Sequence, residues 1–124
     1  MERKPIEDAI EELKSNLNTV ARVNEWAQLM GYKSTKLFSR HFLRKYRCRP
    51  SEILMQIRLK SIITMIRRND KSCTEIAWKH SLPDEKALNS YTNRHFGIPP
   101  KKIKNMSARK LRKKIENSWS KHKE

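Results

Sequence analysis

The sequence contains little glycine and little cysteine, with only 2 of each among its 124 residues. It has no glycine-rich loop that could hold a phosphate, and no alternating strand pattern with hairpin turns. Cys48 and Cys73 form no CxxC pair and combine with none of the histidines at zinc-ligand spacing, so we expect them to be small core residues. No nucleophile and general base assemble from the sequence. We therefore expect no metal, no cofactor and no enzymatic activity.

Long apolar runs are also missing. No stretch approaches the roughly 18 apolar residues of a membrane-spanning helix. Residues 1–5 lack the apolar centre of a signal peptide. Two cysteines without a pairing pattern are typical of a reduced, intracellular protein. We expect no membrane partner and a location in the cytoplasm, at the nucleoid.

Acidic residues become scarce after residue 34. Residues 1–34 contain 5 Lys/Arg against 6 Asp/Glu, whereas residues 35–124 contain 24 against 7. The net charge of the whole chain is +16. Such an uneven positive charge indicates a polyanionic partner, of which nucleic acid is the commonest. An anionic membrane surface is the main alternative.

The most informative positive feature is an internal repeat. Residues 24–53 match residues 74–103 without a gap, at an offset of 50 residues. A repeat of this size indicates two copies of one supersecondary unit. The identical pairs are Glu25/Glu75, Ala27/Ala77, Lys36/Lys86, Arg44/Arg94, Pro50/Pro100 and Ile53/Ile103.

Apolar residues recur at helical spacing along the chain, which predicts an all-α fold. Each copy of the repeat has the pattern of a helix-turn-helix, and the helix predicted between the copies is apolar on more than one face. An N-terminal helix from Pro5 to about Leu17 should precede the first copy. The predicted parts are four. Residues 1–49 form this helix and the first helix-turn-helix, residues 50–69 the linker helix, residues 70–106 the second helix-turn-helix, and residues 107–124 a basic C-terminal helix or tail.

Several motifs carry a family resemblance. The first copy contains Gly31-Tyr32-Lys33-Ser34, Phe38-Ser39-Arg40-His41-Phe42 and Pro50, and the second contains Glu75-Ile76-Ala77, Phe96-Gly97 and Pro99-Pro100. With these motifs the chain resembles the AraC/XylS family of bacterial transcription regulators over about residues 13–104. The resemblance implies a domain of about seven helices, in which a central helix joins two helix-turn-helix units that enter successive major-groove segments. In length the chain is similar to the short members of the family that lack a fused sensor domain.

Four positions depart from the family pattern. Arg47 and Ser81 replace glycines, Ser90 replaces an arginine, and Thr92 replaces the second core phenylalanine. A threonine at a core aromatic position loses apolar burial and leaves a hydroxyl to satisfy, at a cost of about 1–3 kcal/mol. Three of the four changes lie in the second copy. We therefore expect the first copy to carry more of the sequence specificity.

The DNA contacts follow from the resemblance and from helical spacing. If Phe38 and Phe42 point inward, the opposite face of their helix points to solvent. The resemblance places base contacts on this face at Lys36, Ser39 and Arg40. The repeat gives the equivalent candidates in the second copy as Lys86, Asn89 and Ser90. The candidate phosphate contacts are Thr35, Arg44, Lys45, Arg49, Asn93, Arg94, Lys101 and Lys102.

Two of these residues have side chains suited to particular bases. Arg40 can pair bidentately with guanine and Asn89 with adenine. Arg40 and Lys36 could instead contact phosphates. The Glu85 carboxylate could accept a hydrogen bond from the amino group of cytosine, but we favour a role in which it stabilises the N-terminus of its helix.

The sequence thus predicts a sequence-specific, double-stranded DNA-binding transcription regulator, an activator that binds as a monomer. The acidic face of the N-terminal helix either stabilises that helix or contacts RNA polymerase. One alternative is a non-specific DNA- or RNA-binding protein. Another is a basic protein-interaction or membrane-surface module that uses the apolar stripe of Leu111, Ile115 and Trp119.

Overall fold

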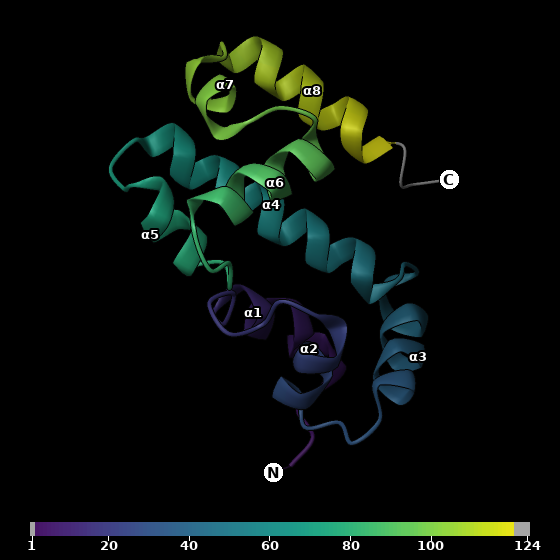
Figure 1. The fold of residues 1–124 in the computed structure, drawn as a ribbon. Coiled ribbons are helices and arrows are strands. Elements are labelled where there is room, and N and C mark those ends of the chain that lie inside the picture. The colour runs from purple at the N-terminus through teal and green to yellow at the C-terminus, as the bar shows by residue number, and fades with distance from the viewer. Residues whose placement is uncertain (1, 121–124) are drawn as a thin grey trace. The chain divides into compact units, whose positions relative to one another are not determined.

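The computed structural model describes the backbone of residues 2–120 and the side chains of residues 2–117. These residues form one short 3-10 helix, eight α-helices and no β-strand (Figure 1). The elements are η1 Ile6–Asp8, α1 Ala9–Lys14, α2 Val23–Leu29, α3 Thr35–Tyr46, α4 Pro50–Arg68, α5 Cys73–Trp78, α6 Glu85–Phe96, α7 Pro100–Asn105 and α8 Ala108–Ser120. The all-α prediction is confirmed. The family resemblance implied about seven helices, and α8 is the additional one. Trp119, part of the predicted C-terminal stripe, lies outside the described side chains.

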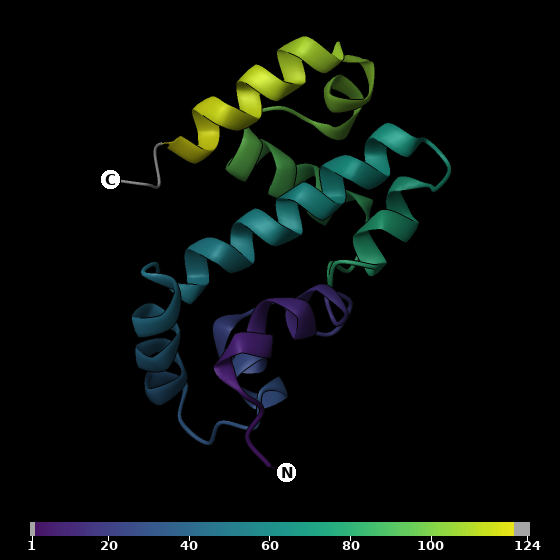
Figure 2. The same cartoon turned by 180° about the vertical axis from the view of Figure 1, so that it is seen from behind.

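The chain divides into two compact units, residues 1–58 and 59–124. The boundary lies inside α4, the long teal helix of Figure 2. Leu54 of α4 belongs to the core of the first unit. Leu59, Ile62 and Ile63 fall in the second unit and are also buried. Because one helix supplies buried residues to two units, its sequence has to be apolar on more than one face.

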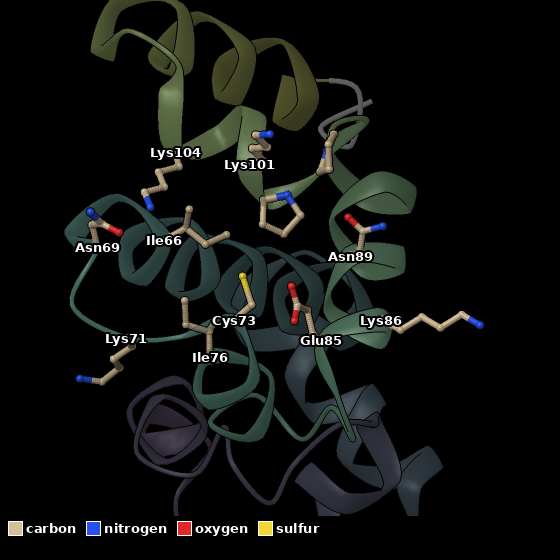
Figure 3. A pocket seen from close by; sticks show the side chains of 12 residues that line it. Ile66, Asn69, Lys71, Cys73, Ile76, Glu85, Lys86, Asn89, Lys101 and Lys104 are labelled. Carbon is tan, nitrogen blue, oxygen red and sulfur yellow. The ribbon is translucent and has the colours of Figure 1, made fainter.

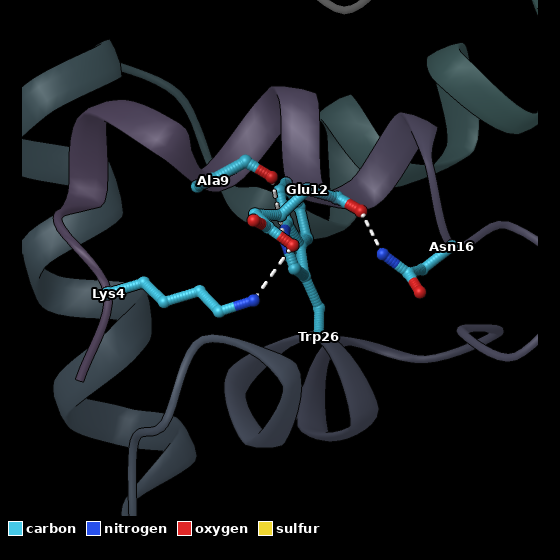
Figure 4. Close-up of polar contacts among 5 residues, drawn as sticks. All are labelled: Lys4, Ala9, Glu12, Asn16 and Trp26. Atoms are coloured by element: carbon cyan, nitrogen blue, oxygen red, sulfur yellow. Dashed lines mark hydrogen bonds and ion pairs between the residues drawn. The ribbon is translucent and has the colours of Figure 1, made fainter. Parts of the chain in front are cut away.

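The core of the first unit is built on aromatic rings. Trp26 on α2 lies edge-on to Phe38 and Phe42 of α3, with centroid distances of 5.3 and 5.0 Å. All three side chains are fully buried, so the predicted inward direction of the two phenylalanines is confirmed. The indole N–H of Trp26 donates to the carbonyl of Ala9 at 3.0 Å and thereby ties α2 to α1 (Figure 4).

The N-terminal helix is shorter than predicted. It starts as η1 and ends at Lys14, and residues 15–19 form turns. The side-chain amide of Asn16 donates to the Glu12 carbonyl at 2.8 Å (Figure 4), and the Asn16 backbone N–H goes to Leu13 instead. An asparagine that captures the carbonyl of residue i−4 removes the acceptor that a continuing α-helix needs. Leu17 is still buried, because the turn carries it back onto the core.

The core of the second unit contains polar groups. Thr92 occupies the position of Phe42 and is fully buried, and its hydroxyl donates to the Asn89 carbonyl at 3.1 Å. The hydroxyl that we expected to need a partner is therefore satisfied within its own helix. His80, at the position of Met30, is also fully buried, with Nδ1 2.6 Å from the Ile76 carbonyl oxygen and Nε2 2.8 Å from the Ser61 hydroxyl.

Candidate nucleic-acid interface

Helices α2 and α3 form the first helix-turn-helix. The turn between them uses Gly31 at φ +81°, and the N–H of Tyr32 donates to the Ala27 carbonyl at 2.9 Å. The Ser34 hydroxyl then accepts from the N–H of Leu37 at 3.2 Å and begins α3, as the sequence predicts. These local interactions fix where the second helix starts and which of its faces is buried.

The outward face of α3 is polar and cationic. Lys36, Arg40 and Leu43 are exposed, Leu43 to 48%, and Ser39 is half-buried. The predicted phosphate contacts of this unit are exposed as well, and they are Thr35, Arg44, Lys45 and Arg49. The predicted direction of this helix face is therefore confirmed, whereas the contacts with DNA stay a prediction.

Arg47 ends α3 in a conformation that favours glycine. Its φ is 62°, in the left-handed region, and its N–H donates to the Leu43 carbonyl at 2.8 Å. Ser81 in the second turn has φ 61°. Both residues stand where the family pattern has glycine, and both keep the glycine conformation at the expense of backbone strain.

Helices α5 and α6 form the second helix-turn-helix. Ser72 begins α5, and the Asp84 carboxylate accepts from the N–H of Ala87 at 2.8 Å to begin α6. Gly97 ends α6 at φ +81°. All the predicted contact residues on α6 and α7 are exposed, and they are Lys86, Asn89, Ser90, Asn93, Arg94, Lys101 and Lys102. The Asn93 side chain donates to the Asn89 carbonyl at 2.9 Å, so part of its donor capacity is used within the helix.

A pocket of about 570 Å³ lies beside the N-terminal half of α6 (Figure 3). Three of the predicted contact residues line it, Lys86, Asn89 and Lys101, whereas Ser90 and Lys102 do not. Figure 3 shows the Glu85 carboxylate beside the Cys73 thiol, with Lys86 extending away from the pocket. The pocket wall therefore combines several lysines with one carboxylate, which suits an anionic partner near α6 more than a cation.

The two cysteines are half-buried and form no disulfide, and Cys48 packs against the core of the first unit. Burial raises the pKa of the Cys73 thiol, and the charge of Glu85 raises it further, while Lys104 opposes the change. Burial and the charge of Glu52 raise the pKa of Cys48. A raised pKa keeps a thiol protonated at neutral pH, and the thiolate is the form that attacks electrophiles or binds metals.

The described residues hold neither a clustered metal site nor a membrane span. Nowhere among them do three His, Cys, Asp or Glu side chains gather closely enough to hold a metal ion. None of the helices in the described part combines the length and apolarity needed to cross a bilayer.

Within the described part of the chain, the Lys and Arg side chains of α3 and α6 form no ion pair with an acid. The two ion pairs found among residues 2–117 join Lys4 to Glu12 and Lys14 to Glu11, both at α1. No predicted contact residue takes part in either. An exposed helix face with unneutralised cations leaves its charge available to a polyanion.

Four cations next to the predicted contacts were not predicted from the sequence. Lys71 and Lys104 line the pocket beside α6, and Arg3 and Lys4 lie beside α3. All four fall outside the matched segments 24–53 and 74–103, so the repeat could not point to them. The only available signal was the overall positive charge, which names no residue.

Solved structures share this fold. The DNA-binding domain of AdpA, described as a global transcriptional factor and solved in complex with a target DNA, gives a TM-score of 0.67 at 20% identity and covers 82% of this chain and 91% of its own. The C-terminal domain of AraT, a response regulator from Geobacillus stearothermophilus, gives 0.68 at 13% identity, covering 83% and 88%. An AraC-type regulator from Chromobacterium violaceum gives 0.63 at 19% identity, covering 81% and 88%.

Comparison by sequence identifies no relative of the chain, because neither a family model nor a curated protein matches it. The structural similarity extends over most of this chain and of each neighbour. The chain therefore has the fold of AraC-type DNA-binding domains, as its sequence motifs predict.

Proposed function

We propose that this chain, whose fold is that of AraC-type DNA-binding domains, is a sequence-specific regulator of transcription that binds double-stranded DNA. The observation that carries the proposal is the pair of helix-turn-helix units, each of which presents an exposed polar and cationic helix face. The fold similarity to a DNA-binding domain solved with its target DNA supports the same function. In this proposal α3 and α6 each enter a major-groove segment.

The two helices make unequal contributions. Arg40 on α3 can pair with both acceptors of guanine, and its exposed guanidinium, which forms no ion pair with residues 2–117, is suited to that contact. On α6, Asn89 is exposed and can pair with adenine, but Ser90 has only a short hydroxyl at the position of Arg40. We therefore assign most of the base discrimination to α3 and most phosphate contacts to the surrounding cations.

The proposal extends to the mode of action. The chain binds its site as a monomer, because two units in one chain provide two recognition helices, and it acts as an activator in the cytoplasm, at the nucleoid. Exposed acids at the N-terminus, Glu7, Asp8 and Glu11, support a contact with RNA polymerase. They also stabilise the first turns of η1 and α1, so the polymerase contact has to be tested separately.

The deciding experiment is selection of bound sites from random duplex DNA by the purified chain, followed by footprinting. We expect a preferred site with two protected major-groove segments about one helical turn apart. One protected segment would limit base reading to one unit. Affinity for the selected site less than about tenfold above that for random duplex would favour a non-specific nucleic-acid-binding protein instead.

A further inference from the structure

The segment that precedes η1 is docked onto the first helix-turn-helix. The N–H of Lys4 donates to the Met30 carbonyl at 2.9 Å, and the Lys4 side chain pairs with Glu12 at 2.9 Å (Figure 4). The Arg3 guanidinium lies over the Tyr32 ring, 4.5 Å from its centroid. Two interactions therefore hold residues 3 and 4 against the turn that leads into α3, and the ion pair ties Lys4 to α1. We call residues 2–5 the N-terminal arm.

The arm and α3 line a pocket of about 540 Å³. Arg44 and Lys45 in its wall are already predicted phosphate contacts, whereas neither the resemblance nor the repeat assigns a role to the arm residues. Its polar lining consists of Arg3, Lys4, Tyr32, His41, Arg44 and Lys45, and no carboxylate lines it. Within residues 2–117, Lys4 is the one cation of this set that forms an ion pair. The Tyr32 hydroxyl and His41 Nδ1 lie 2.9 Å apart, which holds both side chains at the pocket wall.

We propose that this pocket binds a phosphate group. The pocket contains the guanidinium groups of Arg3 and Arg44 and the ammonium groups of Lys4 and Lys45, which provide many N–H donors and positive charge. Guanidinium groups match the geometry of phosphate oxygens and can donate two parallel hydrogen bonds. The Arg3 guanidinium is held in place by its stacking on Tyr32, so it loses little freedom when an anion binds.

The position of the pocket on α3 favours the DNA backbone as the source of that phosphate, and in this respect the inference rests on the proposed function. At about 100° per residue, Arg44 lies about 40° around α3 from Arg40. The pocket therefore borders the helix face that we assign to the major groove. A helix in the groove has sugar-phosphate backbone along its flanks, where contacts position the protein without reading bases.

The first experiment compares Arg3→Gln with Lys14→Gln, a matched control that removes an exposed lysine of α1 outside the pocket. Binding of the full chain to a random-sequence duplex is measured against salt concentration. If Arg3 holds a backbone phosphate, Arg3→Gln should lower the slope of log affinity against log salt by about 0.9, and Lys14→Gln should leave it unchanged. Arg3→Lys, which keeps the charge, should restore the slope, and circular dichroism checks that each variant is folded.

The second experiment uses inorganic pyrophosphate as a probe and follows the His41 ring protons by NMR. Shifts that saturate in the wild-type chain and disappear in Arg3→Gln support the site, whatever the salt slope shows. With an unchanged slope, those shifts assign the pocket to a free phosphorylated compound and not to DNA.

The two experiments together separate the site from the proposed function. If neither the slope nor the ring protons respond to Arg3→Gln while the wild-type chain binds duplex DNA, the pocket proposal is overturned and the proposed function stands. If pyrophosphate binds but no duplex does, the site stands and the proposed function fails.

Discussion

The missing side chain of Gly31 is what allows Arg3 to lie against the turn before α3. A Cβ atom built on Gly31 would lie 2.9 Å from the Arg3 Cα and 2.5 Å from the carbonyl oxygen of Glu2. Both contacts are with backbone, which cannot swing aside as a flexible side chain can. Gly31 therefore serves two purposes, since it supplies the positive φ of the turn and the space for the N-terminal arm.

Gly31→Ala should destabilise the chain more than Gly97→Ala does. Both glycines have φ +81°, so both substitutions bring a left-handed alanine that costs about 1 kcal/mol. A Cβ on Gly97 meets only the Lys114 ammonium at 3.6 Å, whereas one on Gly31 meets the arm. Urea unfolding of both variants measures the difference, and equal losses would show that the arm does not dock on the turn.

Arg47→Gly should stabilise the first unit by about 1 kcal/mol. Arg47 has φ 62°, and glycine adopts this conformation without the strain that a side chain adds. Arg47→Ala is the matched control, because it removes the same charge and keeps a Cβ. A higher urea midpoint for glycine than for alanine is the expected result, and identical midpoints would mean that the left-handed conformation carries no strain.

The sequence predicted the elements whose ends are set by neighbouring residues. Ser34 and Asp84 begin α3 and α6, and Gly97 ends α6, because capping side chains and a left-handed glycine act within a few residues. The end of α1 was not predicted because the Asn16 side chain takes the Glu12 carbonyl that a backbone N–H would use in a longer helix. Apolar periodicity does not reveal such a side-chain hydrogen bond.

The interactions that the sequence did not reveal join distant segments. The arm reaches Tyr32 and Met30, and the His80 ring reaches Ser61, across separations along the chain that no local pattern spans. For the same reason, the predicted contact residues of α6 and α7 could be named but not sorted into those that line the pocket and those that do not. The repeat identified α3 and α6, and only the packed structure shows which cations lie beside them.

His80 and Ser61 should be energetically coupled. His80→Met, which places the residue of the first copy at this position, leaves the half-buried Ser61 hydroxyl without the ring nitrogen 2.8 Å away. We expect a loss of about 1–3 kcal/mol in the free energy of unfolding. Ser61→Ala should cost less in the His80→Met background than in the wild-type chain, and a double-mutant cycle measures the difference. Strict additivity would contradict the interaction.

Cys73 should report on Glu85 and on bound DNA. Because burial and Glu85 raise the thiol pKa, less thiolate is present at a given pH, and alkylation should be slower than for an ordinary exposed cysteine. In a Cys48→Ser background, the iodoacetamide rate should rise with pH, and Glu85→Gln should increase it at pH 8. An equal rate in Glu85→Gln would rule out the charge effect. Duplex DNA should slow the reaction if Lys86 and Asn89, which line the same pocket, contact DNA.

Arg40 and Lys101 should differ in how they affect binding. Arg40→Ala should cost about 1–3 kcal/mol at the selected site and relax preference at one or two base positions, because a bidentate contact to guanine is lost. Lys101→Ala should weaken all duplexes alike and lower the salt slope by about 0.9, as the loss of one phosphate contact does. Binding to the selected site, to single-base variants and to random duplex measures both effects. If Arg40→Ala weakens all sequences equally, Arg40 contacts phosphate, and the base-reading role assigned to α3 has to pass to Lys36 and Ser39.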